Sequence, residues 1–255
     1  MSSFQARQLS KYFLFSLSLF FLFADCASAL QVRIGVCQLE SRDGQVFHNL
    51  IEVDNCVRTL KIAYPDLKMV VLPELIDTGF TSIVRASTGG EHARPVPGET
   101  TDILTYIAQS HNVWIVAAVL EDVLGGVYDT SIAISPNGLE TKVRKLRAYL
   151  RYGGRRVYIG GGDDGGAIWT PFGYISVLNC TDIAAPSKAD KLAKNADLIL
   201  GVLANPSHNH MRDLAQVSTR LGVPTVGANM IFPTRSPSGG FSQYTDSSGS
   251  IDFQA

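Results

Sequence analysis

Short apolar runs alternate with stretches of helical periodicity along most of the chain. The runs rich in Val, Ile and Leu that have the length of a buried strand are 32–39, 69–72, 114–120, 173–179, 197–203 and 223–228. Between them apolar residues recur every three or four positions, as expected of amphipathic helices, over 50–60, 101–112, 187–195 and 210–221. Strands that alternate with helices predict an α/β protein of layered architecture.

Two hairpins interrupt this alternation. Ser131–Ser135 runs into Pro136-Asn137-Gly138, and an Asn-Gly pair supplies the positive φ angles of a tight turn, so the return strand is predicted to pass through Val143. A polar stretch rich in Ser, Gly and Pro closes the chain as a second hairpin. The 255 residues suffice for one sizeable core, and neither an internal repeat nor a linker marks a boundary after residue 30. One domain, residues 30–255, is therefore expected.

The first 29 residues have the pattern of a signal peptide. Arg7 and Lys11 precede the apolar run 13–23, and Ala27-Ser28-Ala29 follows as a cleavage site of the A-x-A type. An uncleaved membrane anchor is the alternative, although the run is shorter than the ~20 residues of a spanning helix. A lipoprotein modified at Cys26 fits less well. We expect an exported protein, secreted or periplasmic, without stable membrane insertion after cleavage.

Charge and cysteine content narrow the possible functions. Without residues 1–29 the chain holds 20 Lys and Arg against 22 Asp and Glu, a balance that implies no nucleic-acid partner. Only Cys37, Cys56 and Cys180 remain, so the chain is no disulfide scaffold. We expect Cys37 and Cys56 to be buried free thiols, although export permits a disulfide. An odd cysteine in an exported protein suggests a reactive thiol.

Three reactive side chains follow apolar or β-rich runs. Glu74 comes directly after Val70-Val71-Leu72-Pro73, Lys145 ends the return strand of the first hairpin, and Cys180 ends Ile175–Asn179. Each alone would fit a structural role. Together they form a chemical unit, because a thiol needs a base to become a nucleophile and a cation can stabilise the charge that develops on a carbonyl oxygen.

The order and spacing of these residues resemble the carbon-nitrogen hydrolase superfamily, which includes nitrilases and aliphatic amidases. The resemblance covers essentially the whole chain after the signal peptide. The segments that carry it are Val32–Gln38, Val70–Glu74 with Thr78-Gly79-Phe80, Val143–Lys145, Ile175–Asp182, Val223–Asn229 and Gly239-Gly240.

The resemblance implies a four-layer αββα sandwich of the nitrilase type, whose subunits pair as a homodimer or larger homo-oligomer. It implies that Cys180 is the nucleophile, that Glu74 is the general base and later the acid, and that Lys145 stabilises the oxyanion. Water would then hydrolyse a thioester acyl-enzyme on a small amide, with neither metal nor organic cofactor. The substrate-binding residues are not predicted by the sequence.

Two positions depart from the family pattern. Members commonly carry a second Glu between the lysine and the cysteine motifs, whereas this chain has no Glu after Glu140. Asp163 and Asp164 are possible substitutes, but their glycine-rich surroundings, 160–166, match a loop better. Thr181 replaces the usual aromatic residue after the nucleophile, and the Trp-Glu of nitrilases proper is missing. These features favour an amidase over a nitrile hydrolase.

A basic run and three weaker signals complete the pattern. Seven Lys and Arg and no acid lie between Lys142 and Arg156, which fits a solvated face or a basic rim that selects amides bearing a carboxylate. His208 and His210 are a weak metal signal without further ligands. Asn179-Cys180-Thr181 matches the N-glycosylation motif but is predicted to be inaccessible.

Three other functions stay open at this stage. The missing Glu and Thr181 allow a non-catalytic binding protein on the same fold. An amide-forming acyltransferase would pass the acyl group to an amine instead of water. A papain-like enzyme would require one essential histidine among His48, His92, His111, His208 and His210.

Overall fold

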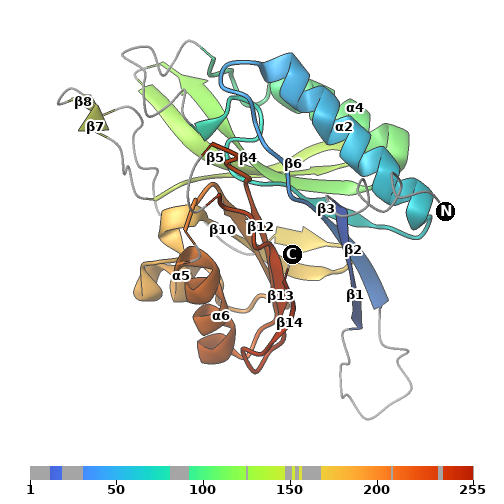
Figure 1. Ribbon diagram of the computed structural model, residues 1–255, viewed down its shortest axis with the longest axis vertical. Coiled ribbons are helices and arrows are strands. Elements are labelled where there is room, and N and C mark those ends of the chain that lie inside the picture. The colour runs from blue at the N-terminus through green and yellow to red at the C-terminus, as the bar shows by residue number, and fades with distance from the viewer. Residues whose placement is uncertain are drawn as a thin grey trace.

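The computed structural model describes residues 12–18, 31–80, 92–124, 126–146, 151–152, 155–156, 168–207, 209–234 and 238–254. Two six-stranded mixed sheets form its centre (Figure 1). The first sheet has the order β1-β2-β3-β4-β5-β6: Tyr12–Ser18, Gln31–Cys37, Met69–Val71, Trp114–Val123, Gly126–Ser135 and Gly138–Arg144. The second has the order β14-β13-β12-β11-β10-β9: Ile251–Gln254, Gln243–Thr245, Thr225–Asn229, Leu198–Leu203, Gly173–Asn179 and Ile168–Thr170. A two-stranded pair consists of β7, Arg151–Tyr152, and β8, Arg155–Arg156.

The central strands of both sheets run parallel. In the first sheet β2, β3 and β4 are parallel, and in the second β10, β11 and β12 are parallel. All six residues of β11 are buried, as expected of a strand covered on both faces. Parallel neighbours bring their carboxyl ends to one edge, where loops can display reactive groups.

Helices cover the outer face of each sheet. The helices α2, Val46–Ala63, and α4, Glu99–His111, lie over the first sheet, whereas α5, Pro186–Leu192, and α6, Asn209–Leu221, lie over the second (Figure 1). The two sheets face each other. The protein is thus a four-layer αββα sandwich, which confirms the predicted fold class.

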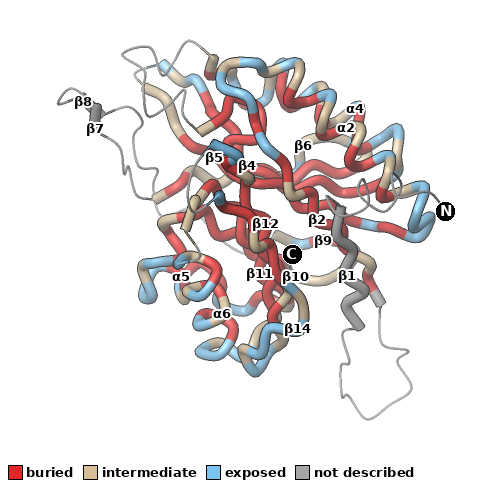
Figure 2. Tube along the Cα trace, viewed as in Figure 1, coloured by how far each residue is buried: buried red, intermediate tan, exposed pale blue. Residues whose placement is uncertain are grey.

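Three apolar cores hold the layers together, and the buried positions follow them in Figure 2. The middle core joins the inner faces of the sheets, where Val36 and Val71 meet Val202 and Val226. The outer cores lie beneath the helix pairs. The predicted stripe Leu50, Val53, Val57 and Leu60 is buried under α2. Apolar periodicity therefore predicted which faces are covered.

The second sheet accepts α6 at close range because two paired positions carry glycine. Gly201 and Gly227 are register partners on β11 and β12. A Cβ at Gly201 would lie 2.8 Å from Leu214 of α6, and a Cβ at Gly227 would lie 2.7 Å from Met211. The helix can therefore rest directly on the backbone of the sheet.

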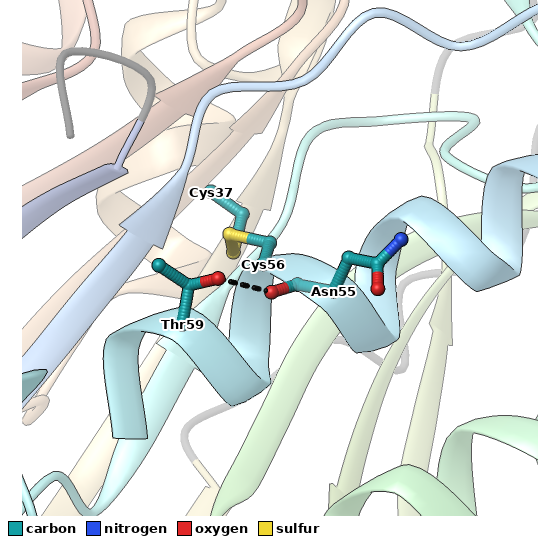
Figure 3. Close-up of a disulfide and its surroundings, with 4 residues drawn as sticks. All are labelled: Cys37, Asn55, Cys56 and Thr59. Atoms are coloured by element: carbon teal, nitrogen blue, oxygen red, sulfur yellow. Dashed lines mark hydrogen bonds between the residues drawn. A yellow bond between two sulfur atoms is a disulfide. The ribbon is translucent and has the colours of Figure 1, made fainter. Parts of the chain in front are cut away.

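A disulfide joins Cys37, the last residue of β2, to Cys56 of α2 (Figure 3). The expectation of two free thiols is wrong, because the end of the strand and the middle of the helix face each other with Cα atoms 6.2 Å apart, a separation that disulfides span. Both cysteines are fully buried.

The predicted hairpins are confirmed. The strands β5 and β6 pair antiparallel around Asn137-Gly138, and β13 and β14 close the chain. At the other end β1, inside the predicted signal peptide, pairs antiparallel with β2, so cleavage after Ala29 would make β2 an edge strand. Among the described helices, none is long and apolar enough to cross a membrane.

Candidate active site

The three predicted residues come together at one end of the two sheets, two of them just after parallel strands and the third just after the hairpin β5-β6. Glu74 lies in the turn after β3, and Cys180 directly follows β10. Lys145 follows β6 in the first sheet and reaches Glu74 from the side of the hairpin β5-β6. Each of the three side chains is at least 95% buried.

Glu74 is held by two donors. Its Oε1 forms an ion pair with Nζ of Lys145, and the backbone N–H of Ala204, just after β11, donates to its Oε2 at 2.8 Å. Burial and then the neighbouring charge of Cys180 raise the pKa of Glu74 to about 7, although Lys145 acts in the opposite direction. A carboxyl group with such a pKa can accept and return a proton near neutral pH.

Cys180 occupies a strained turn. Its φ angle is +41°, in the left-handed region that residues with a side chain rarely adopt, and it begins the short 3-10 turn Cys180–Asp182. Leu75, next to Glu74, has a φ of +55°. Backbone strain of this kind is concentrated at functional sites, where the surrounding structure holds it in place.

The sequence reading missed Asp129 of β5. Its Oδ2 lies 3.0 Å from Nζ of Lys145, and its Oδ1 accepts a hydrogen bond of 2.8 Å from Nδ2 of Asn179. The side chain is fully buried, and burial raises its pKa to about 7 against the effect of Lys145. The available signal was an acid flanked by Tyr128 and Thr130 in a strand that turns apolar at Ile132, three residues later.

Backbone contacts tie the lysine segment to the cysteine segment. The N–H of Lys145 donates to the carbonyl of Asp129 at 2.8 Å, and the N–H of Leu146 donates to Oδ2 of Asp182 at 2.9 Å. Asp182 lies two residues after Cys180 and is buried. Side chains from three distant segments are therefore fixed in one arrangement.

Two cations of the basic run are paired with a buried acid. Lys142 and Arg144 both form ion pairs with the buried Glu121, and their hydrogen bonds hold its pKa at about 2 although burial would raise it. The guanidinium of Arg144 also lies 4.2 Å from the ring centre of Tyr128. The side chains of residues 147–156 lie outside the described residues. The side chains of Lys142 and Arg144 keep 35% and 33% exposure, which fits the solvated face, and both cations are paired with Glu121.

The weaker signals have ordinary structural explanations where they are described. Asn179 is buried and its Nδ2, the atom that glycosylation would modify, donates to Asp129 and Ser131, as expected of an inaccessible motif. His210 lies 3.2 Å from Asp213 of its own helix. Asp163, Asp164 and His208 fall outside the described residues.

A hollow of about 250 Å³ opens among the loops that follow the neighbouring strands β2 and β12. It lies between the loop after β2 and the loop after β12, each one strand away from the strands that precede Glu74 and Ala204. Its lining combines apolar and polar side chains, among them Phe80, Phe232 and Arg42. The rings of Phe80 and Phe232 meet edge to face with centres 5.6 Å apart.

Residues 33–241 match the sequence profile of the carbon-nitrogen hydrolase family, so the chain belongs to this family. Among curated relatives, it is 34% identical over 135 residues to a nitrilase of Pyrococcus abyssi, which covers 52% of this chain and 50% of the relative. It is 26% identical over 163 residues to an (R)-stereoselective amidase of a Pseudomonas species, which covers 64% of this chain and 56% of that relative. The chain thus spans about half the length of these relatives.

Solved structures show the same fold. An amidase from Nesterenkonia sp. superposes with a TM-score of 0.76 at 18% identity, covering 88% of this chain and 86% of that one. A carbon-nitrogen hydrolase from Helicobacter pylori superposes with a TM-score of 0.74, also at 18% identity, covering 88% and 85%.

Proposed function

We propose that the protein hydrolyses a non-peptide C–N bond in a small amide, with Cys180 as the nucleophile. Glu74 accepts the thiol proton while the sulfur attacks the carbonyl carbon, and Lys145 stabilises the negative charge that develops on the carbonyl oxygen. The C–N bond then breaks, and Glu74 returns the proton to the leaving amine. A thioester between the acyl group and Cys180 remains.

The second half of the cycle uses the same groups. Glu74, again ionised, removes a proton from a water molecule that attacks the thioester, and the carboxylic acid leaves as the thiol is restored. The observation that carries this proposal is the buried contact of Lys145 with Glu74, whose pKa responds to the charge of Cys180. A base, a cation and a thiol that interact inside a protein suit acyl transfer better than a merely structural role.

Two comparisons support this chemistry. A mutant of the Nesterenkonia sp. AN1 amidase carries the product of Michael addition of acrylamide at its active-site cysteine. The curated relatives include both a nitrilase and an amidase. We favour an amide substrate because the Trp-Glu that follows the cysteine of nitrilases proper is replaced by Thr181-Asp182.

The remainder of the substrate is assigned to the hollow beside Phe80. Its volume of about 250 Å³ suits a small organic group, and the apolar walls would cover part of that group. Arg42 offers a guanidinium to a substrate that bears a carboxylate, whereas Glu40 and Asp43 at the same hollow disfavour one with a large negative charge. A small amide with at most one carboxylate fits this lining.

Export and self-association belong to the same proposal. The disulfide Cys37–Cys56 supports an exported location, because such bonds persist mainly in oxidising compartments. The family also implies a homodimer or larger homo-oligomer. The molecular mass of the protein in solution should then be a multiple of the mass of one chain.

The proposed function is tested with the purified protein and a panel of small amides and nitriles, by measuring the release of ammonia or amine. We expect turnover of at least one amide, loss of turnover in Cys180→Ala, and a covalent acyl group on Cys180 during the reaction. Transfer of the acyl group to an added amine in preference to water would identify an acyltransferase. Binding of an amide without turnover or acylation would favour the non-catalytic alternative.

A further inference from the structure

Lys145 is shared between two carboxyl groups that have different tasks. Glu74 Oε1 and Asp129 Oδ2 both contact its ammonium, and all three side chains are at least 98% buried. Burial of two carboxylates against one cation is costly, so an arrangement of this kind is maintained only where it serves a purpose or where many contacts enforce it. Asp129 has contacts on both of its carboxyl oxygens that hold this arrangement in place.

The second oxygen of Asp129 reaches the strand that carries the nucleophile. Oδ1 accepts from Nδ2 of Asn179, the residue directly before Cys180, and that same Nδ2 lies 3.3 Å from Oγ of Ser131. One carboxylate on β5 therefore connects the oxyanion-stabilising cation on one sheet to the nucleophile's turn on the other. The described parts of β5 and β10 are not joined by backbone hydrogen bonds, because the two strands belong to different sheets.

The catalytic cycle proposed above gives this link a purpose, and the inference rests on that proposed function. When Glu74 takes the proton of the thiol it becomes neutral, so its attraction for the ammonium of Lys145 weakens just as the oxyanion begins to form. Asp129 has a second anchor, because its Oδ1 accepts from Nδ2 of Asn179. It therefore remains to hold the ammonium where the oxyanion develops, at the step that depends most on a fixed electrostatic environment.

We propose that Asp129 is a positioning residue that acts through Lys145 and Asn179, fixing the cation relative to the sulfur of Cys180. The groups that face Asp129 are Lys145, Asn179 and Glu74, with Asp77 as the next carboxyl within electrostatic reach.

The test separates acylation from simple thiol reactivity. Acylation of Cys180 by p-nitrophenyl acetate, followed by p-nitrophenolate release, forms a tetrahedral oxyanion and so requires Lys145 in place. Alkylation by iodoacetamide forms none. We expect Asp129→Asn to lower the acylation rate by about 100-fold, as removal of one oxyanion stabiliser does, while the alkylation rate changes far less. A merely structural role would lower both rates together.

A double-mutant cycle then identifies the partner. If Asp129 acts through Lys145, Asp129→Asn has no further effect on acylation in a Lys145→Ala background. An equal loss in both backgrounds would overturn the proposal. Glu121→Gln is the matched control, because Glu121 is similarly buried and likewise ion-paired, in its case with two cations, but lies outside the site. This variant should lower the thermal midpoint and leave both rates unchanged.

A second variant covers the case in which Asp129→Asn does not fold. Asn179→Ala keeps the charge of Asp129 and removes its hydrogen bond, so acylation should fall by about tenfold, the equivalent of one hydrogen bond; an unchanged rate would contradict the inference. Wild-type protein whose Cys180 is alkylated but never acylated would instead contradict the proposed function, and this role of Asp129 with it.

Discussion

At the scale of residues, the site concentrates buried negative charge around one cation. Glu74, Asp77 and Asp129 are all buried and burial raises the pKa of each to about 7. Asp77 lies in the same turn as Glu74, and its Oδ1 accepts from the N–H of Thr78 at 2.9 Å. In contrast to the other two, it has no ion pair with Lys145 among the described contacts.

This arrangement makes stability depend on pH with a definite sign. A group whose pKa is higher in the folded than in the unfolded chain binds its proton more tightly when folded. Its contribution is therefore present below pH 4 and is lost as the pH rises through about 7. We expect Asp77→Asn to raise the free energy of unfolding at pH 8 and to change it little below pH 4, measured by urea denaturation. An equal effect at both pH values would show that Asp77 does not carry a buried charge.

The residues themselves were predicted unequally. Glu74, Lys145 and Cys180 could be found because each follows an apolar or β-rich run and the three share an order with a known family. Asp129 could not, since the family pattern has its second acid between the lysine and the cysteine, whereas Asp129 precedes both. Its partner Lys145 is 16 positions away along the chain, and only the folded hairpin brings the two together.

At the scale of elements, the disulfide ties the carboxyl end of β2 in the first sheet to the helix α2. Cys37 ends β2, and the loop that follows it lines the hollow beside Phe80. Cys56 lies on the buried face of α2, where Thr59 donates back to the carbonyl of Asn55 (Figure 3). The periodicity of the helix predicted that Cys56 is buried, but not that it faces the end of β2, because that depends on how the helix lies across the sheet.

Removal of this bond should weaken the fold without stopping the chemistry. A Cys37→Ala, Cys56→Ala double variant is expected to lose about 3 kcal/mol of unfolding free energy, the value for a closed loop of this length. Turnover at 25 °C should be unchanged, because neither cysteine takes part in the hydrogen bonds and ion pairs that hold Glu74 and Lys145. A denaturation midpoint that is the same in the double variant and the wild type would contradict a stabilising role.

At the scale of the whole molecule, the layered α/β architecture followed from the pattern of strands and helices, and the four-layer sandwich from the resemblance to the family. Apolar periodicity identified the covered faces, and the Asn-Gly turn set the hairpin that delivers Lys145. The pattern could not fix the facing of the two sheets, because many pairs of apolar strands could pack equally well. That facing is what brings Asn179 to Asp129 and Ala204 to Glu74.

The proposed export makes a prediction for the intact chain. Expressed with its own first 29 residues in a bacterium that exports proteins, the protein should be recovered outside the cytoplasm with Leu30 as its first residue and with Cys37 bonded to Cys56. Mass spectrometry of the unreduced protein checks both points. Recovery of a full-length chain in the membrane would favour the anchor instead.

The central claim, that Glu74, Lys145 and Cys180 form one working site, is tested most directly by brief alkylation of Cys180 across pH. The wild type should label faster above pH about 7, where Glu74 is ionised. Glu74→Ala should lose that dependence. Lys145→Ala should move it to higher pH, because the ammonium lowers the pKa of Glu74. A Cys180 that labels slowly at every pH, and equally in all three proteins, would contradict the account.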